Sequence, residues 1–380
     1  MSEPTPKAKK GAPPEPMAED KLQGLLQGSI GKALRKRFGE HAFGVASENR
    51  VLLNRQVIPT GVYPLDVGLG GGVPVGLVTS FWGPKSSAKS ALCAKTVAQA
   101  QRLCARCYQR RPCACKEPDD LLAAYVDVEG TTDLRWLAHL GVQVERLLYT
   151  QPSTGEDAVE IVETLLRSGT CNLVVLDSIA FLQPAKEIDR EVNQPTPGAQ
   201  ARLLTEASRR IVAALNAQGN LTGRRPTLLT VSQERSKVGV VWGSPIVQAG
   251  GFAVGYLNAV EIRTSGGKVE MVEDKEARKE FPVYATNTVT VVKSKVAAPR
   301  TQGEYRLFFA DSGLKKRGDV GDETAMVDDA EYAGLLTKVG MRYLLLDKEF
   351  PTRSHVETGL MESADYKAQV RDALLAVLLK

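Results

Sequence analysis

Short apolar runs alternate with helical segments through the middle of the chain, and this alternation constrains the fold more than any other feature. Each apolar run has the length of a buried strand, and each helical segment has the spacing of an amphipathic helix. Such alternation predicts an α/β fold with a mostly parallel, twisted sheet and helices on both faces. The expected strands lie at 76–83, 121–130, 171–181, 226–233 and within 284–310, and the expected helices at 89–103, 131–140, 155–168 and 198–218.

The flanking regions differ from this core in composition. The first residues are rich in Pro, Lys and Glu, which predicts a disordered tail. A helix is expected over 20–38 and an extended segment at 51–60. The expected divisions are the tail at 1–18, an N-terminal element at 19–55, the core at 56–314 and a small α+β domain at 315–380.

The composition argues against a membrane protein and permits an anionic partner. The chain has 380 residues, of which 43% are hydrophobic, so it can bury a large core. No apolar run reaches the roughly 18 residues that cross a bilayer, and the first residues lack an apolar signal core. We therefore expect a cytoplasmic protein. The net charge of +5 is mildly basic and permits a polyanionic partner.

The segment after the first strand departs at one position from the phosphate-binding pattern G-x-x-x-x-G-K-[ST], because Ala88 replaces the second glycine. Between a strand and a helix, the backbone N–H groups of such a loop bind phosphates. We expect Lys89 to bind the β- and γ-phosphates of ATP and Ser90 to bind Mg²⁺. The alternative is a serine-rich turn with an incidental lysine. This phosphate loop comprises Gly83, Pro84, Lys85, Ser86, Ser87, Ala88, Lys89 and Ser90.

Two carboxylates stand at the ends of predicted strands. Asp177 ends the run "NLVVLD" and is expected to hold Mg²⁺ through water. Glu129 ends "YVDVE" and is expected to activate a water molecule for hydrolysis. Either acid alone could be a helix cap. Their order after the phosphate loop favours a nucleotide-hydrolysing site.

The chain resembles bacterial RecA and its virus-encoded relatives, the homologous-recombination ATPases, from about residue 20 to the C-terminus. The resemblance is carried by "IPTGVYPLDVGLGGGVPVG", "GPKSSAKS", "VVLDSIAFLQPAKEI", "SQERSKVGVVWGSPIVQAGG" and "VVKSKVAAP". It implies a recombinase that polymerises on single-stranded DNA as a helical filament with ATP and Mg²⁺, pairs it with duplex DNA and exchanges strands. It also implies that the N-terminal element polymerises the subunits and that the C-terminal domain receives duplex DNA. Single-strand-binding and loader proteins are further candidate partners.

The resemblance also implies roles for single residues around the nucleotide. Asp133 and Trp136 would hold the adenine, and Gln233, at the end of a strand, would sense the γ-phosphate. Lys293 and Lys295 would reach the γ-phosphate bound by the neighbouring subunit. Since they lie at i and i+2, both side chains would face the same side of an extended strand.

Two loops are expected to bind DNA without strong sequence preference. One spans 186–198 and precedes a helix, on which the resemblance assigns Arg202 and Arg209 to DNA phosphates. The other follows Gln233. Its phosphate-binding, apolar and stacking residues are Arg235, Lys237, Val238 and Trp242.

Four residues depart from the bacterial pattern: Lys85, Ala88, Trp136 and Pro197. We expect an active ATPase, and two alternatives stay open. One is a filament or mediator protein that binds ATP without hydrolysing it because Ala88 distorts the loop. The other is a hexameric helicase of the same fold, against which the long DNA loop argues.

An insertion at 104–118, here called the Cys-rich insertion, has no counterpart in bacterial RecA. Its cysteines follow the spacing C-x₂-C-x₅-C-x-C, which suits one tetrahedral Zn²⁺. A disulfide pair, unfavoured in a reducing cytosol, and unliganded thiols are the alternatives. Cys93 and Cys171 are expected in the core. The expected zinc ligands are Cys104, Cys107, Cys113 and Cys115.

Overall fold

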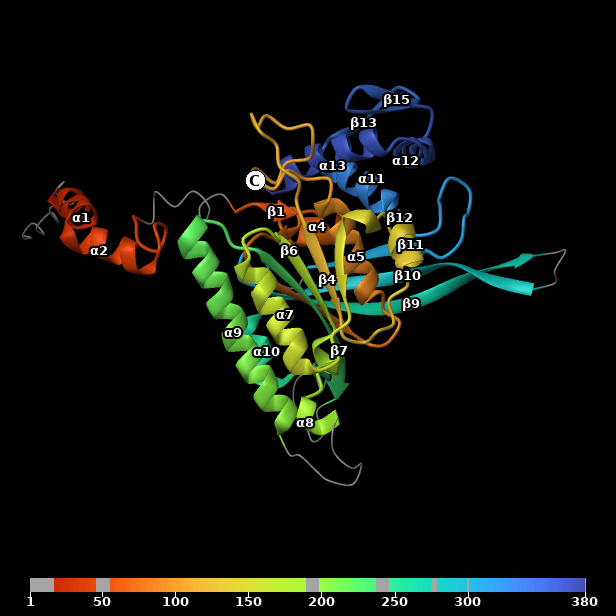
Figure 1. The fold of residues 1–380 in the computed structure, drawn as a ribbon. Helices are drawn as coiled ribbons and strands as arrows, with labels where there is room; N and C mark the ends of the chain where they lie inside the picture. The colour runs from red at the N-terminus through yellow and green to blue at the C-terminus, as the bar shows by residue number, and fades with distance from the viewer. Residues whose placement is uncertain are drawn as a thin grey trace, which may run out of the picture.

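The computed structural model confirms the predicted α/β fold, with a large, mostly parallel sheet covered by helices (Figure 1). The predictions for residues 1–16 of the N-terminal tail and for most of the first DNA loop lie outside the described residues, whereas Met17 and Ala18 of the predicted tail belong to a helix. The described residues are 17–45, 55–188, 198–236, 246–274, 279–298 and 301–379.

The central sheet has ten strands and changes direction along its width. The strands from β9 to β5 in spatial order are parallel, whereas β10, β11 and β12 are antiparallel to their neighbours. The far part of β9 and β10 extends from the body as a two-stranded ribbon (Figure 1). In spatial order the strands are β12 (Val320–Gly321), β11 (Gln302–Phe308), β10 (Lys279–Ser294), β9 (Val260–Asp274), β3 (Val78–Gly83), β7 (Thr227–Ser236), β6 (Leu173–Asp177), β4 (Ala123–Asp127) and β5 (Leu147–Thr150), with β8 (Ile246–Gln248) paired to β7.

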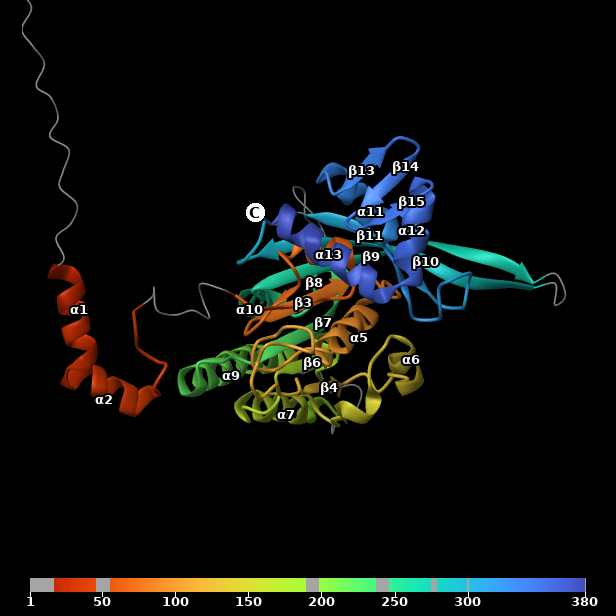
Figure 2. The ribbon, with the colours of Figure 1, turned by 90° about the horizontal axis from the view of Figure 1, so that it is seen from above.

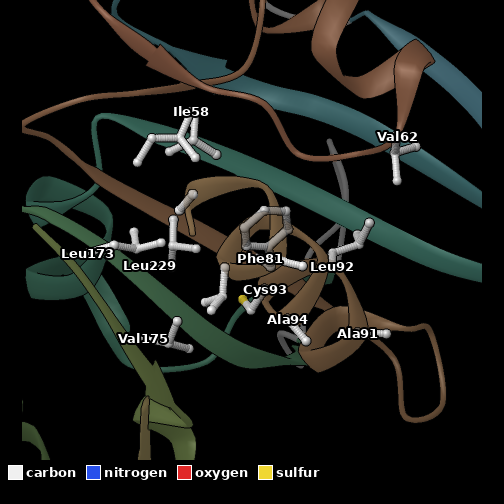
Figure 3. Packing of buried hydrophobic residues seen from close by; sticks show 14 of the residues in the cluster. Ile58, Val62, Phe81, Ala91, Leu92, Cys93, Ala94, Leu173, Val175 and Leu229 are labelled. Carbon is white, nitrogen blue, oxygen red and sulfur yellow. The ribbon is translucent and has the colours of Figure 1, made fainter. Parts of the chain in front are cut away.

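Both faces of the parallel strands are buried, because successive side chains point to opposite sides. In β6, Leu173 and Val175 join one hydrophobic core, whereas Val174 and Leu176 join another. Figure 3 shows the first core, where Phe81 of β3 packs near residues of α5. The second core lies under α7 and α9 (Figure 2). The helices around the sheet are α4 (Tyr63–Gly68), α5 (Lys89–Ala100), α6 (Leu134–His139), α7 (Gly155–Arg167), α8 (Ala185–Ile188), α9 (Ala199–Thr222) and α10 (Gly251–Leu257).

The prediction of one helix over 20–38 is wrong, because the segment forms α1 (Met17–Gln27) and α2 (Ser29–Phe38). Gly28 between them is extended, with ψ of −178°. The two helices meet closely: a Cβ atom on Gly31 would lie 2.1 Å from the carbonyl oxygen of Leu26. The segment after α2 contacts α9 through a hydrogen bond from His41 N to the carbonyl oxygen of Asn220, 2.9 Å long.

Part of the predicted extended segment 51–60 forms a short strand. β1 (Val57–Ile58) pairs with β2 (Val73–Pro74) in an antiparallel sheet of two strands. Residues 51–54 lie outside the described part of the chain.

The C-terminal region has a hydrophobic core of its own, which includes Met326, Leu345, Val356 and Leu374. No helix in the described ranges is both long and apolar enough to span a membrane. The elements of this region are α11 (Glu323–Tyr332), β13 (Leu336–Val339), β14 (Arg342–Leu345), β15 (Lys348–Phe350), α12 (Arg353–Glu362) and α13 (Ala364–Leu378).

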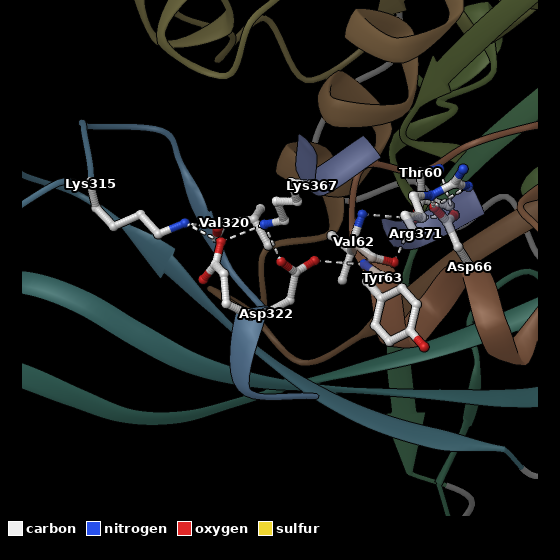
Figure 4. Close-up of polar contacts among 10 residues, drawn as sticks. Thr60, Val62, Tyr63, Asp66, Lys315, Val320, Asp322, Lys367 and Arg371 are labelled. Carbon is white, nitrogen blue, oxygen red and sulfur yellow. Dashed lines mark hydrogen bonds and ion pairs between the residues drawn. The ribbon is translucent and has the colours of Figure 1, made fainter. Parts of the chain in front are cut away.

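Buried charges join this region to α4 (Figure 4). Arg371 of α13 donates to Oδ2 of the fully buried Asp66 over 2.8 Å. Asp322 accepts a hydrogen bond of 2.7 Å from Tyr63 N and an ion pair of 2.5 Å from Lys367. The C-terminal region is therefore held to α4 by paired charges as well as by apolar packing.

Candidate functional site

The phosphate loop connects the carboxyl end of β3 to the first turn of α5. Gly83 begins it at a φ of +154°, and a Cβ atom there would lie 2.1 Å from the carbonyl oxygen of Thr264. Ser87 Oγ donates to the carbonyl oxygen of Pro84 over 2.8 Å and shares a 2.6 Å hydrogen bond with the hydroxyl of Thr264. The loop thus curls tightly at the positive end of the α5 dipole, where an anion is stabilised.

Ala88 adopts the backbone conformation for which the pattern specifies glycine. Its φ is 61° and its ψ is 21°, in the left-handed region. A residue with a Cβ atom loses about 1–2 kcal/mol in this region. The substitution therefore keeps the shape of the loop but adds backbone strain to it.

Lys89 lies among three carboxylates. Its Nζ donates to the carbonyl oxygen of Pro84 over 2.5 Å. Burial lowers the pKa of the Lys89 amine, and the nearby charges of Asp177, Glu129 and Glu234 oppose that shift. A cation at the start of α5 suits an anionic ligand such as a phosphate.

Asp177 ends β6 and is buried. It accepts a 2.6 Å hydrogen bond from the hydroxyl of Tyr125 and another from Ser90. Burial raises the pKa of Asp177 to about 6, and the hydrogen bonds from Ser90 and Tyr125 only partly offset it. A hydroxyl and a carboxylate oxygen side by side are donors that Mg²⁺ prefers, so the residues fit this ion.

The carboxylate of Glu129 is held by Ser178, the residue that follows β6. Ser178 Oγ donates to Oε1 of Glu129 over 2.7 Å. The acid at the end of β4 itself is Asp127, which pairs in register with Asp177 and was missed. Asp127 accepts hydrogen bonds of 2.8 Å from Tyr149 and 3.0 Å from Thr132 N, which hold its pKa low although burial opposes them.

The run "VDVEG" contains two acids, and the predicted strand at 121–130 extends past both of them, whereas β4 ends at Asp127. The prediction that Glu129 ends the strand is therefore wrong, because Glu129 lies in the loop after β4. We infer that Asp127 fixes the loop that carries Glu129.

The expectation that Gln233 ends a strand is wrong, since β7 continues to Ser236 and pairs with β8. Gln233 lies opposite Gly83 in the register of β7 and β3, beside the phosphate loop. Arg235 follows within β7 and is exposed. The other residues expected in this DNA loop, Lys237, Val238 and Trp242, lie outside the described residues.

The arginines expected to bind DNA lie on α9. Arg202 and Arg209 line an open hollow of about 490 Å³ on this helix together with Thr205. The neighbouring Arg210 instead pairs with Glu163 of α7 over 2.5 Å. Residues 189–197 of the first loop are not among those described.

The two residues expected at the adenine lie at the start of α6. Asp133 caps this helix and accepts a 2.8 Å hydrogen bond from Arg135 N, which lowers the pKa of Asp133. Trp136 is half-buried. Its ring lies 6.5 Å from that of Phe309 and 5.4 Å from the Arg317 guanidinium. Sequence reasoning missed both partners, because they are far away along the chain.

The two lysines expected to act on a neighbouring subunit do not share one strand. Lys293 lies in β10, but β10 ends at Ser294, so Lys295 lies outside the strand that was expected to hold both lysines. An irregularity in the pairing with β9 also falls between Val291 and Lys293. Lys293 Nζ donates to the carbonyl oxygens of Gly255 and Asn258 over 2.5 and 2.8 Å.

The Cys-rich insertion brings its four thiols together. The Sγ atoms of Cys104, Cys107, Cys113 and Cys115 all lie within 4.8 Å of one another. The backbone N–H of Asp119 points at Cys104 Sγ over 3.5 Å. All six cysteines are free, and the remaining two, Cys93 and Cys171, are buried as expected.

A family model and several known proteins match this sequence over most of its length. The sequence model of the RecA N-terminal domain family matches residues 26–314. The chain is 35% identical over 294 residues to Protein RecA of Symbiobacterium thermophilum, covering 76% of each chain. It is 32% identical over 347 residues to Protein RecA of Bdellovibrio bacteriovorus, covering 90% of this chain and 82% of that one. With Protein RecA of Ectopseudomonas oleovorans the identity is 33% over 350 residues, covering 88% and 91%.

The fold and the phosphate loop thus define a P-loop ATPase. Within that class the chain belongs to the RecA family. It is a DNA-dependent ATPase and an ATP-dependent recombinase that exchanges DNA strands, and its family binds ATP and Mg²⁺ and forms filaments on single-stranded DNA. The non-hydrolysing alternative is not favoured.

Proposed function

We propose that the chain performs ATP-dependent strand exchange with the site at the carboxyl ends of β3, β4 and β6. The supporting observation is the convergence of Lys89, Ser90, Asp177 and Glu129 at this edge of the sheet. In this proposal Lys89 binds the β- and γ-phosphates and the remaining residues of the phosphate loop surround them. Asp133 and Trp136 hold the adenine.

The same four residues would also carry out the hydrolysis of ATP. Mg²⁺ would neutralise charge on the phosphates, and Ser90 and Asp177 would hold it. Glu129 takes a proton from the attacking water, and Ser178 keeps its carboxylate oriented toward the site. Lys89 stabilises the negative charge that increases on the phosphate oxygens.

We further propose that DNA binding is coupled to the nucleotide through β7. Gln233 lies beside Gly83 and leads directly into the DNA loop, so a change at the γ-phosphate can be transmitted along one strand. The proposed DNA contacts are Arg202, Arg209, Arg235, Lys237, Val238 and Trp242.

Each ATP site is proposed to be completed by Lys293 and Lys295 of a neighbouring subunit. Residues 19–55 would join subunits in the filament, 56–314 would form the ATPase core, and 315–380 would receive duplex DNA. Lys293 now bonds two carbonyl groups near the end of α10, so it must exchange these bonds for phosphate when subunits assemble.

A mixing experiment tests the site and its completion together. Glu129→Gln protein and Lys293→Ala/Lys295→Ala protein should each be inactive alone in a DNA-stimulated ATPase assay. Mixed filaments should recover activity at interfaces that pair an intact Glu129 with intact lysines. Mixed filaments without recovered activity would contradict action across the interface.

We propose that the Cys-rich insertion binds one structural Zn²⁺. A tetrahedral Zn²⁺ with sulfur ligands at about 2.3 Å separates those sulfurs by about 3.8 Å, which fits the observed cluster. The insertion is also anchored on both sides: Gln56 donates to the carbonyl oxygen of Cys107 over 3.1 Å, and Arg224 to that of Ala105 over 3.4 Å. We further propose a cytoplasmic location and cooperation with single-strand-binding and loader proteins, as for other strand-exchange systems.

A further inference from the structure

The Arg317 guanidinium lies over the ring of Trp136, at 5.4 Å from the ring to its central carbon. Arg317 belongs to the loop between β11 and β12. Sequence reasoning gave it no role. Its side chain forms no ion pair with a carboxylate in the described ranges of the chain. Its five N–H donors are therefore available to a ligand beside Trp136.

The loop that carries Arg317 is held in place. Arg317 N donates to Asp311 Oδ1 over 2.8 Å, and Lys316 N donates to Asp319 Oδ2 over 2.7 Å. The loop also packs against α6: Gly318 has a φ of +89°, and a Cβ atom there would lie 2.1 Å from the carbonyl oxygen of His139. The position of Arg317 beside Trp136 is thus fixed by the backbone on both sides.

The two walls beside the indole differ in chemistry. Phe309 packs against Trp136 with its ring tilted by 40°, and both side chains pack against the first hydrophobic core. Arg317 is exposed and attached through a long, flexible stem. A flat ligand can therefore reach Trp136 by displacing the arginine rather than the phenylalanine.

We propose that Arg317 is a base-contacting residue, and that the purine ring of the bound nucleotide lies between the indole of Trp136 and the Arg317 guanidinium. This inference rests on the proposed nucleotide site. Two stacked layers need about 7 Å, so the guanidinium moves outward by about 2 Å when the base enters. In the new position it stacks on the base and donates hydrogen bonds to acceptors on its edge.

The test separates contacts to the base from contacts to the phosphates. Binding of ATP and of inorganic tripolyphosphate, each with Mg²⁺, is measured by calorimetry for the full chain. Arg317→Ala should weaken ATP binding about threefold to tenfold, the range expected for one cation–π contact, and leave tripolyphosphate binding unchanged. Arg317→Lys should lie between. Lys316→Ala removes the same charge from the adjacent residue and should bind both ligands like the unchanged protein.

The outcomes that overturn the inference are specific. Unchanged ATP affinity in Arg317→Ala would remove the base contact, and an equal loss for ATP and tripolyphosphate would indicate a general effect on the site. A loss of the same size in Lys316→Ala would indicate charge alone. If the unchanged protein bound neither ligand, the proposed nucleotide site would fail, and this inference with it.

Discussion

The two loops at the ends of α5 differ in which atoms they present. The phosphate loop, at the N-terminal end, is proposed to bind phosphate through backbone N–H groups, and it holds two non-glycine residues, Ser86 and Ala88, at positive φ. The Cys-rich insertion, which follows the C-terminal end, brings four side-chain sulfurs together and is proposed to bind Zn²⁺ through them. A loop that works with its backbone tolerates an altered side chain at the cost of strain, as Ala88 illustrates. A loop that works with its side chains should not tolerate the loss of one.

The largest effect is expected from removing the Lys89 cation of the phosphate loop. Lys89→Ala should abolish ATP-dependent strand exchange, because a buried charge contact to phosphate is lost where nothing replaces it. A D-loop assay with single-stranded and supercoiled DNA measures this. The control is Lys268→Ala, which removes an exposed lysine of β9. Exchange that persists in Lys89→Ala would show that the loop does not bind the phosphates as proposed.

The corresponding change in the Cys-rich insertion is Cys113→Ser. We expect about one Zn²⁺ per unchanged chain and a marked loss in the variant, because a hydroxyl does not replace a thiolate ligand. Elemental analysis gives the metal content, and hydrogen exchange should show faster exchange within 104–118 while the ATPase core stays protected. Cys171→Ala is the control and should keep its zinc. Metal-free unchanged protein would rule out the site.

The pH dependence of stability can be compared between the unchanged protein, which carries Asp177 beside the phosphate loop, and Asp177→Asn. The pKa of Asp177 is raised to about 6 in the folded chain, above its usual value of 3.8, so the folded state binds the proton more tightly than the unfolded state. Stability should therefore fall as the pH rises from about 4 to 6, by on the order of 2 kcal/mol relative to Asp177→Asn. Urea unfolding without Mg²⁺ or ATP measures it. Parallel profiles for the two proteins would contradict the raised pKa.

The smallest expected effect comes from relieving the backbone strain at Ala88. Ala88→Gly should stabilise the chain by about 1 kcal/mol, since glycine avoids the left-handed penalty but gains freedom in the unfolded state. Nucleotide affinity or turnover should rise with it. Ala91→Gly makes the same change inside α5 and should destabilise by a similar amount, about 1 kcal/mol. Destabilisation by Ala88→Gly would indicate that the loop has adapted to alanine.

The sheet was predictable from sequence because its central strands are buried on both faces and read as unbroken apolar runs. The helix break at Gly28 was not, since glycine weakens a helix without specifying a tight crossing such as the one at Gly31. The end of β10 before Lys295 was also not predictable, because strand ends depend on the partner strand.

Site residues at the ends of strands could be predicted from the sequence. Site residues that depend on contacts between distant parts of the chain could not. Asp177 was found from its position after an apolar run, and the same reasoning stopped at Glu129 without noticing Asp127. The partners of Trp136 come from the loop after β11, and no local pattern connects that loop to α6. Contacts of this kind depend on tertiary packing, which a single sequence does not reveal.

The ion pair between Arg371 and Asp66 has a consequence for shortened forms of the chain. Asp66 is fully buried and also accepts a 2.7 Å hydrogen bond from Thr60 N, so it shapes the segment that leads into α4. A chain cut before Arg371 would leave that carboxylate without its counter-charge, and breaking a buried pair from one side costs about 3–5 kcal/mol. Deleting the last helix would thus destabilise α4, which lies about 300 residues earlier in the sequence. A truncation that loses DNA exchange would need Asp66→Asn alongside it before the loss could be attributed to the C-terminal region itself.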